Sequence, residues 1–193
     1  MQETFRKLGS FLLDIIQTVV LALSIFVISY LFLVQPHQVR GNSMYPNFEN
    51  NDFLLTDKIS YRFQQPHRGD IVIFKAPSSE PCIEEECEYI KRLIGLPGET
   101  ISIKDGSYLI NNEKLDELYL PQDLKTGPAL FLPAGKTITM GTDEYFFSGD
   151  NRPYSRDSRA FGSIKKDAIV GKAWLMYWPP RKIGFIPYPH YNF

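Results

Sequence analysis

Residues 11–34 read FLLDIIQTVVLALSIFVISYLFLV and divide the chain into two parts of different character. As an α-helix with a rise of about 1.5 Å per residue, the uncharged residues 15–34 match a membrane hydrocarbon core of roughly 30 Å. Leucine, isoleucine, valine and phenylalanine occupy every face, whereas a half-buried helix of a soluble core shows a polar stripe. The stretch therefore predicts a single membrane-spanning helix.

A cleaved signal peptide is the main competing interpretation of this stretch. Its apolar region would be about 7–15 residues long and would precede a small-x-small cleavage site, but Val34-Gln35-Pro36 follows here. We therefore expect an uncleaved anchor. The predicted organisation is a cytoplasmic N-terminus at 1–10, a transmembrane anchor at 11–34 and an extracytoplasmic domain at 35–193.

The charges around the anchor predict its orientation. Arg6 and Lys7 precede it and only Arg40 follows closely, which favours an N-terminus on the inner side. Asp14 is expected at the headgroup level, because a charge deeper in the bilayer costs about 2.5–3.5 kcal/mol. The membrane itself, whether plasma, inner or thylakoid, is left open.

The outer part is expected to form one β-rich domain. Short stretches of strand character lie between turn signals such as Leu96-Pro97-Gly98, and no convincing amphipathic helix follows residue 35. The pattern predicts an all-β domain with barrel-like or multi-sheet closure. The expected strands are residues 52–60, 70–75, 88–94, 100–104, 108–111, 137–140, 144–148 and 169–178.

Charge, cysteine and histidine content argue against nucleic-acid binding and against a metal site. A formal net charge of -1 offers no basic surface for nucleic acid. Cys82 and Cys87 are the two cysteines, and outside the cytoplasm they predict a local disulfide, with two free thiols as the alternative. The three histidines are scattered, so we expect no metal site and no cofactor.

Ser43, in the stretch GNSMYP just beyond the anchor, is the candidate nucleophile. A serine hydroxyl needs a base, and no Gly-x-Ser-x-Gly elbow indicates a histidine partner. A lysine can serve if burial lowers its pKa, since only about one lysine in a thousand is neutral near pH 7. Lys91 in the apolar stretch YIKRLIG meets this requirement, although an exposed edge lysine is the commoner meaning of such a pattern.

Four blocks of sequence carry a resemblance to a known family. SMYP, RGDIVIF, YIKRLIGLPGE and GDNRPYSRDSR follow the apolar stretch in this order and cover essentially the whole chain. In these blocks the sequence resembles type I signal peptidases, membrane-anchored Ser-Lys proteases that remove signal peptides from exported proteins. The resemblance implies a multi-sheet, barrel-like β fold shared with LexA-type regulators, and we expect a monomer that contacts membrane lipid and preprotein signal peptides.

The resemblance also implies roles for individual residues. The family's nucleophile corresponds to Ser43, its general base to Lys91 and the serine that orients the lysine to Ser155. Supporting charged residues correspond to Asp150, Asp157 and Arg159.

The same resemblance implies an oxyanion hole and binding pockets. The backbone N–H of Ser43 would stabilise the oxyanion, and Gly41 lacks the hydroxyl that some members supply as a second donor; Asn42 is a further candidate. Small pockets would select a pattern of alanine, any residue, alanine before the cut, with the substrate extended between residues 39–42 and 88–91. The expected pocket walls are Val39, Met44, Phe48, Tyr89 and Ile90.

Three alternatives remain open from the sequence. One is a Ser-Lys self-cleaving regulator, although such a protein carries a DNA-binding segment in place of the anchor. Another is a non-catalytic, membrane-anchored β domain that binds partners. The third is a penicillin-recognising acyl enzyme, suggested only by Ser163-Ile164-Lys165-Lys166, which fits the Ser-x-x-Lys pattern.

Overall fold

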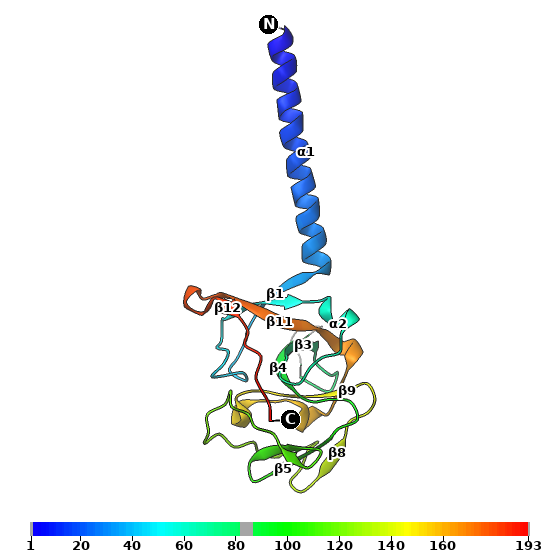
Figure 1. The fold of residues 1–193 in the computed structure, drawn as a ribbon, viewed down its shortest axis with the longest axis vertical. Coiled ribbons are helices and arrows are strands. Elements are labelled where there is room, and N and C mark those ends of the chain that lie inside the picture. The colour runs from blue at the N-terminus through cyan, green and yellow to red at the C-terminus, as the bar shows by residue number, and fades with distance from the viewer. Residues whose placement is uncertain (1, 82–86, 193) are drawn as a thin grey trace.

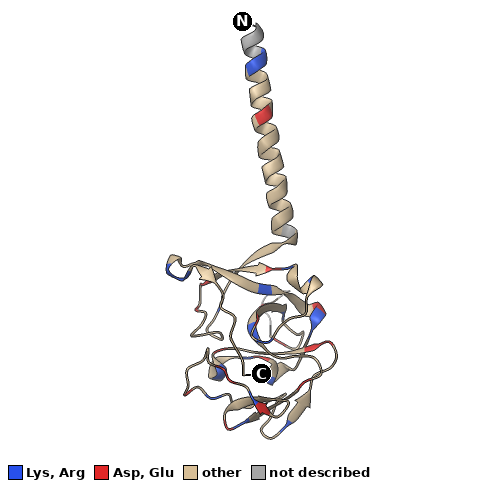
Figure 2. Ribbon diagram, viewed as in Figure 1, with Lys and Arg blue, Asp and Glu red and all other residues tan. Residues whose placement is uncertain are grey.

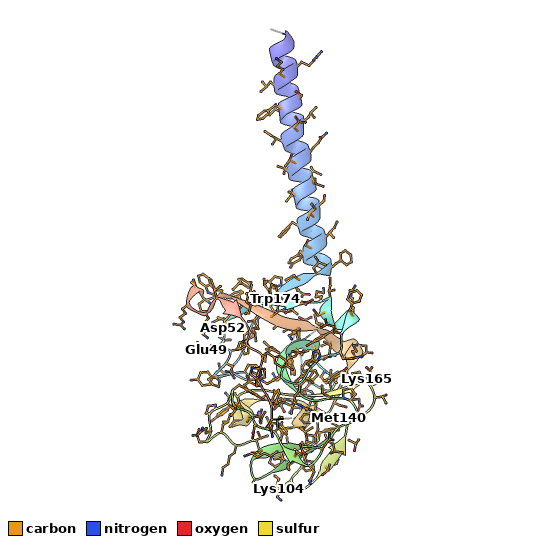
Figure 3. All side chains as sticks on the ribbon, viewed as in Figure 1. Glu49, Asp52, Lys104, Met140, Lys165 and Trp174 are labelled. Atoms are coloured by element: carbon orange, nitrogen blue, oxygen red, sulfur yellow. The ribbon has the colours of Figure 1, made fainter. Side chains whose placement is uncertain are left out.

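A long N-terminal helix stands on a β-rich domain in the computed structural model, which describes residues 2–81 and 87–192 (Figure 1). The helix α1 spans Gln2–Phe32 and includes a candidate membrane span, Arg6–Tyr30, with a mean hydropathy of 2.5 and no buried residues. Its side chains project on all sides, and the helix meets the domain at its C-terminal end, beside β1 (Figure 3). A fully exposed apolar surface of this length is stable in lipid rather than in water.

The charges on α1 lie in its first half. Arg6 and Lys7 come near the start and Asp14 follows, after which the helix carries no charged residue as far as the domain (Figure 2). The helix begins at Gln2, before the predicted anchor at 11–34, and no proline interrupts residues 2–10. It ends at Phe32, and Val34 is the first residue of β1.

The domain consists of two antiparallel sheets, which confirms the predicted all-β class with one N-terminal helix. In the larger sheet the order is β1-β2-β11-β3-β4-β9-β10, with β12 paired to β11; the smaller sheet has the order β7-β6-β5-β8. The larger sheet comprises β1 Val34–Gln38, β2 Phe53–Asp57, β3 Ile71–Lys75, β4 Glu88–Gly95, β9 Glu144–Ser148, β10 Ile164–Lys165, β11 Ile169–Trp178 and β12 Gly184–Phe185. The smaller sheet comprises β5 Thr100–Lys104, β6 Ser107–Ile110, β7 Glu113–Lys114 and β8 Thr137–Thr139.

Helices within the described part of the domain are short. They are α2 Ser60–Phe63, α3 Ser158–Phe161 and the 3-10 turns η1 Arg152–Tyr154, η2 Lys166–Ala168 and η3 Pro180–Lys182. The predicted disulfide depends on Cys82, which lies outside the described residues, so it stays a prediction.

The strand β3 lies at the centre of the larger sheet, and both of its faces are buried. Ile71 and Ile73 pack into one apolar cluster, while Val72 and Phe74 pack into another on the opposite face. Alternation along a strand produces this division, and burial of both faces explains why residues 71–74 are continuously apolar. The rigid centre fixes the position of β4, its antiparallel neighbour, which carries Lys91.

Candidate active site

Ser43 lies in a turn that follows β1 and is held by backbone contacts. Gly41 adopts φ +87°, a left-handed conformation that favours glycine, and its N–H donates to the side-chain Oδ1 of Asn50 at 2.8 Å. The carbonyl of Ser43 accepts a hydrogen bond from the N–H of Asn151 at 3.0 Å. The turn is therefore anchored to the loop at residues 149–159, which sequence reasoning also placed at the site.

Lys91 reaches Ser43 from β4, although 48 positions separate them in the sequence. Its Nζ lies 2.8 Å from Ser43 Oγ and 2.9 Å from the carbonyl oxygen of Ile90. Lys91 is 4 % exposed, so its amine is surrounded by protein rather than by water. Arg92, the next residue, points to the other side and pairs with Asp150, as alternation along a strand requires.

Burial has a chemical consequence for Lys91. Removal from water disfavours the ammonium form and lowers its pKa to about 8, although the carboxylates of Asp157 and Asp150 oppose this shift. A lysine with a pKa near 8 has a substantial neutral fraction at mildly alkaline pH. The neutral amine is the form that can accept a proton from a serine hydroxyl.

Asp150 is fully buried and fixes the other side of β4. Its carboxylate accepts two hydrogen bonds from Arg92, Nε to Oδ1 at 2.8 Å and Nη2 to Oδ2 at 2.7 Å. Asn47 donates a third at 2.8 Å, which connects this pair to the turn that carries Ser43. Asp150 thus contacts both β4 and the turn of Ser43, and the supporting role that the resemblance implies for it stays a prediction.

Asp157 and Arg159 form a second buried pair within the same loop. Arg159 donates from Nε to Oδ1 and from Nη2 to Oδ2, both at 2.8 Å, and Asp157 also accepts from the N–H of Gly149 at 3.0 Å. Burial raises the pKa of Asp157, but the Arg159 guanidinium outweighs it and holds that pKa below the ordinary value. The loop is thus closed on itself by a charged pair.

The structure does not show the hydrogen bond predicted between Ser155 and Lys91. Ser155 Oγ is buried against Gly149, and it lies close enough to Asp157 to contribute to the lowered pKa of that carboxyl. Lys91 Nζ instead donates to Ser43 Oγ and to the Ile90 carbonyl oxygen. The backbone of the lysine's own strand thus takes the orienting position, and a role for Ser155 stays a prediction.

A cavity of about 380 Å³ opens beside Ser43 and Lys91. Val39, Tyr89 and Ile90 line it as predicted, together with two apolar side chains that sequence reasoning missed, Leu54 and Ile73. Both belong to core strands, and their alternation within β2 and β3 is the only sequence signal that points to them.

Met44 and Phe48, by contrast, are not among the lining residues of this cavity, so their place in a pocket wall stays a prediction. Their side chains are 1 % and 3 % exposed and pack in the apolar cluster beneath the site. The turn after Ser43 directs them inward, where their apolar surface is removed from water.

Among the described residues, no group of three or more His, Cys, Asp or Glu side chains is arranged to hold a metal ion.

Comparison with known proteins identifies the family of this chain. The family model described as signal peptidase, peptidase S26, matches residues 12–178. The chain belongs to this signal peptidase family. Its relatives include a signal peptidase I of Leptolyngbya laminosa, 35% identical over 192 residues that cover 96% of this chain and 89% of the relative.

Two further relatives have similar coverage. A probable signal peptidase I-2 of Synechocystis sp. is 31% identical over 96% of this chain and 78% of its own length. A signal peptidase IB of Staphylococcus aureus is 32% identical over 87% of this chain and 90% of its own length. A crystal structure of a signal peptidase I from Enterococcus faecalis V583 has 30% identity and a TM-score of 0.43, covering 56% of this chain and 97% of that one.

Membership in the signal peptidase family carries two conclusions. The family consists of serine endopeptidases, so membership implies that this chain hydrolyses peptide bonds. With its N-terminal apolar helix, the chain is a membrane-anchored member of the family. The alternative interpretations as a self-cleaving regulator, a binding domain or a penicillin-recognising enzyme lack this support.

Proposed function

We propose that this signal peptidase cleaves signal peptides from exported preproteins with Ser43 as nucleophile and Lys91 as general base. One observation carries the proposal: the buried Lys91 Nζ lies 2.8 Å from Ser43 Oγ at the edge of an apolar cavity. The distance permits direct proton transfer, and the burial supplies the lowered pKa that the transfer needs.

The proposed reaction moves one proton at a time. Neutral Lys91 accepts the hydroxyl proton of Ser43 as Oγ attacks the scissile carbonyl carbon and forms a tetrahedral intermediate. The ammonium then gives this proton to the departing amine, which leaves an acyl ester on Ser43. Lys91 next takes a proton from water, the hydroxide attacks the ester, and the proton returns to Ser43 Oγ as the acid product leaves.

The backbone N–H of Ser43 is the proposed oxyanion donor. It forms no hydrogen bond with another described residue, so it is free to bind a developing negative charge. Gly41 N–H is already used by Asn50 and cannot serve as the second donor. Removal of one oxyanion donor typically costs about 100- to 1,000-fold in rate, so a fixed turn at Ser43 matters for catalysis.

An open strand edge supports binding of an extended substrate. Over Glu88–Arg92, β4 pairs with β3 on one side, whereas its pairing with β9 on the other side starts only at Arg92. The second edge of residues 88–91 therefore faces the cavity and the chain at 39–42. A peptide can add there through backbone hydrogen bonds, with alternate side chains entering the cavity.

The anchor supports the proposed location of the reaction. By the Lys/Arg rule, Arg6 and Lys7 place the N-terminus inside, so the domain lies on the outer face of the membrane. The strand β1 begins at Val34, directly after α1, which keeps Ser43 near the bilayer surface. A signal peptide anchored in the same membrane is thereby confined near the site, which raises its effective concentration.

The pH dependence of cleavage tests the lysine base. We expect kcat/KM to rise with pH through about 8, because Lys91 must lose its proton before it can accept one from Ser43. The measurement is cleavage of a preprotein by the detergent-solubilised full chain between about pH 6 and 9, with folding verified at each pH. A flat profile over this range would argue against Lys91 as the base.

The size of the apolar cavity sets the expected side-chain preference. The Ile90→Ala variant removes part of one wall, so valine or leucine at one of the two inward-facing substrate positions should be cleaved about tenfold better relative to alanine. Competition between two preproteins that differ at that position measures this ratio. Ile183→Ala, at a position 61% exposed outside the cavity lining, is the matched control and should leave the ratio unchanged.

A further inference from the structure

Two side-chain bridges cross the cavity beside Ser43, and only one of them belongs to the reaction described above. Lys91 and Ser43 form the first. The second joins His37 in β1 to Glu88 at the start of β4, with Nε2 2.8 Å from Oε2. Both of these residues line the cavity, so this contact connects its two walls away from the nucleophile.

A buried hydroxyl holds the imidazole of His37 in place. Its Nδ1 lies 2.8 Å from Thr56 Oγ1 in β2, which pairs with β1, and Thr56 has no exposed surface. With both ring nitrogens engaged, the imidazole is fixed between a hydroxyl and a carboxylate. Because substrate cannot reach Thr56, this chain of contacts is no second nucleophile and base, and its function must come from its place on the cavity wall.

Glu88 contributes a carboxylate to the cavity wall. Its hydrogen bond with His37 is the main cause of a lowered pKa, with smaller contributions from Lys75 and Lys58, so the carboxylate is ionised at neutral pH. The side chains of His37 and Glu88 are 15% and 27% exposed, which leaves them accessible from the cavity. The hydrogen bond to His37 therefore satisfies a carboxylate that a bound peptide would otherwise meet.

The spacing along β4 indicates which part of a substrate lies beside Glu88. Glu88 precedes Lys91 by three positions, or about 10 Å at roughly 3.3 Å per residue. If the residue before the cut lies beside Lys91, an extended peptide on this edge places its third or fourth residue before the cut beside Glu88. That register rests on the proposed function.

We propose that the His37–Glu88 pair is a specificity determinant that excludes basic substrate residues at the third and fourth positions before the cut. The histidine occupies the carboxylate and blocks its use as a partner for lysine or arginine. Without His37, Glu88 would lose its hydrogen-bond partner at the groove, and its carboxylate would attract a basic side chain.

Charge-matched substrates test this proposal with the full chain in detergent. Two series of preproteins carry alanine or lysine at the third or at the fourth position before the cut, and the lysine-to-alanine ratio of kcat/KM is measured in each. We expect His37→Leu to raise this ratio by about three- to tenfold in at least one series. The double variant His37→Leu with Glu88→Gln should return it close to the wild-type ratio, because no carboxylate remains.

The outcomes separate the two proposals. His190→Leu, an exposed histidine at another site, is the matched control and should not change the ratio. The ratio compares two substrates of the same variant, so a general loss of activity in His37→Leu cancels, and an unchanged ratio in both series would overturn the specificity role. No cleavage of any substrate by the wild type would overturn the proposed function and this inference with it.

Discussion

Replacement of Lys91 with alanine is expected to lower kcat/KM for a preprotein by about 10²- to 10⁴-fold, the usual contribution of a positioned general base. The reason is geometric, since the Lys91 Nζ is the group 2.8 Å from Ser43 Oγ. The Arg92 guanidinium points away and is held by Asp150, so the neighbouring residue cannot substitute for the missing amine. Initial rates with the solubilised full chain measure the loss.

Two control variants distinguish lost chemistry from lost folding. Lys91→Met keeps much of the volume and removes a buried ammonium, so at pH 7 we expect it to unfold no more easily than the wild type while it remains inactive. Lys104→Ala, at an exposed position at the end of the domain far from α1 (Figure 3), should keep full activity. Cleavage by Lys91→Ala within about threefold of the wild-type rate would contradict the assignment.

Replacement of Asp150 with alanine should have the largest effect on stability. It leaves the Arg92 guanidinium buried and unpaired, and loss of one partner of such a pair typically costs about 3–5 kcal/mol of unfolding free energy. Asn47 loses an acceptor at the same time, which releases the turn of Ser43. Denaturant unfolding of the full chain in micelles measures the change.

The double variant Arg92→Met with Asp150→Leu distinguishes an unpaired charge from a simple packing defect. An apolar pair of similar volume should recover much of the lost stability, because no buried charge remains. Arg181→Ala is the surface control: its partner Glu49 lies 3.8 Å away at an exposed position, so the cost should stay below about 1 kcal/mol. If Asp150→Ala and Arg181→Ala lowered the free energy of unfolding equally, the buried pair would contribute no more to stability than the exposed one.

The long strands follow from local pattern, whereas the shortest ones do not. The period-two and apolar stretches predicted β2, β3, β4, β5, β6, β8, β9 and β11 within a few residues. The strand β1 was missed because Val34–Gln38 contains Pro36 and continues directly from the anchor; as an edge strand it tolerates the proline. Strands of two residues, such as β10 and β12, depend on pairing with distant segments and leave no periodic signal.

Some features of the candidate site could likewise be predicted from local sequence, whereas others depend on contacts between distant segments. The sequence pattern made Ser43 and Lys91 candidates, and the family resemblance paired them, because a lysine in an apolar strand is by itself more often exposed. The inward direction of Met44 and the place of Ile73 in the cavity lining depend instead on the path of the turn and on packing between strands. The contact between His37 and Glu88 joins residues 51 positions apart, and neither residue alone signals it.

The most direct test of the central claim is cleavage of a preprotein with an alanine-x-alanine site by the solubilised full chain and by its Ser43→Ala variant. N-terminal sequencing of the product locates the cut. The account predicts a cut directly after the second alanine by the wild type and no product above background with Ser43→Ala. Cleavage at this site by Ser43→Ala at the wild-type rate would contradict it.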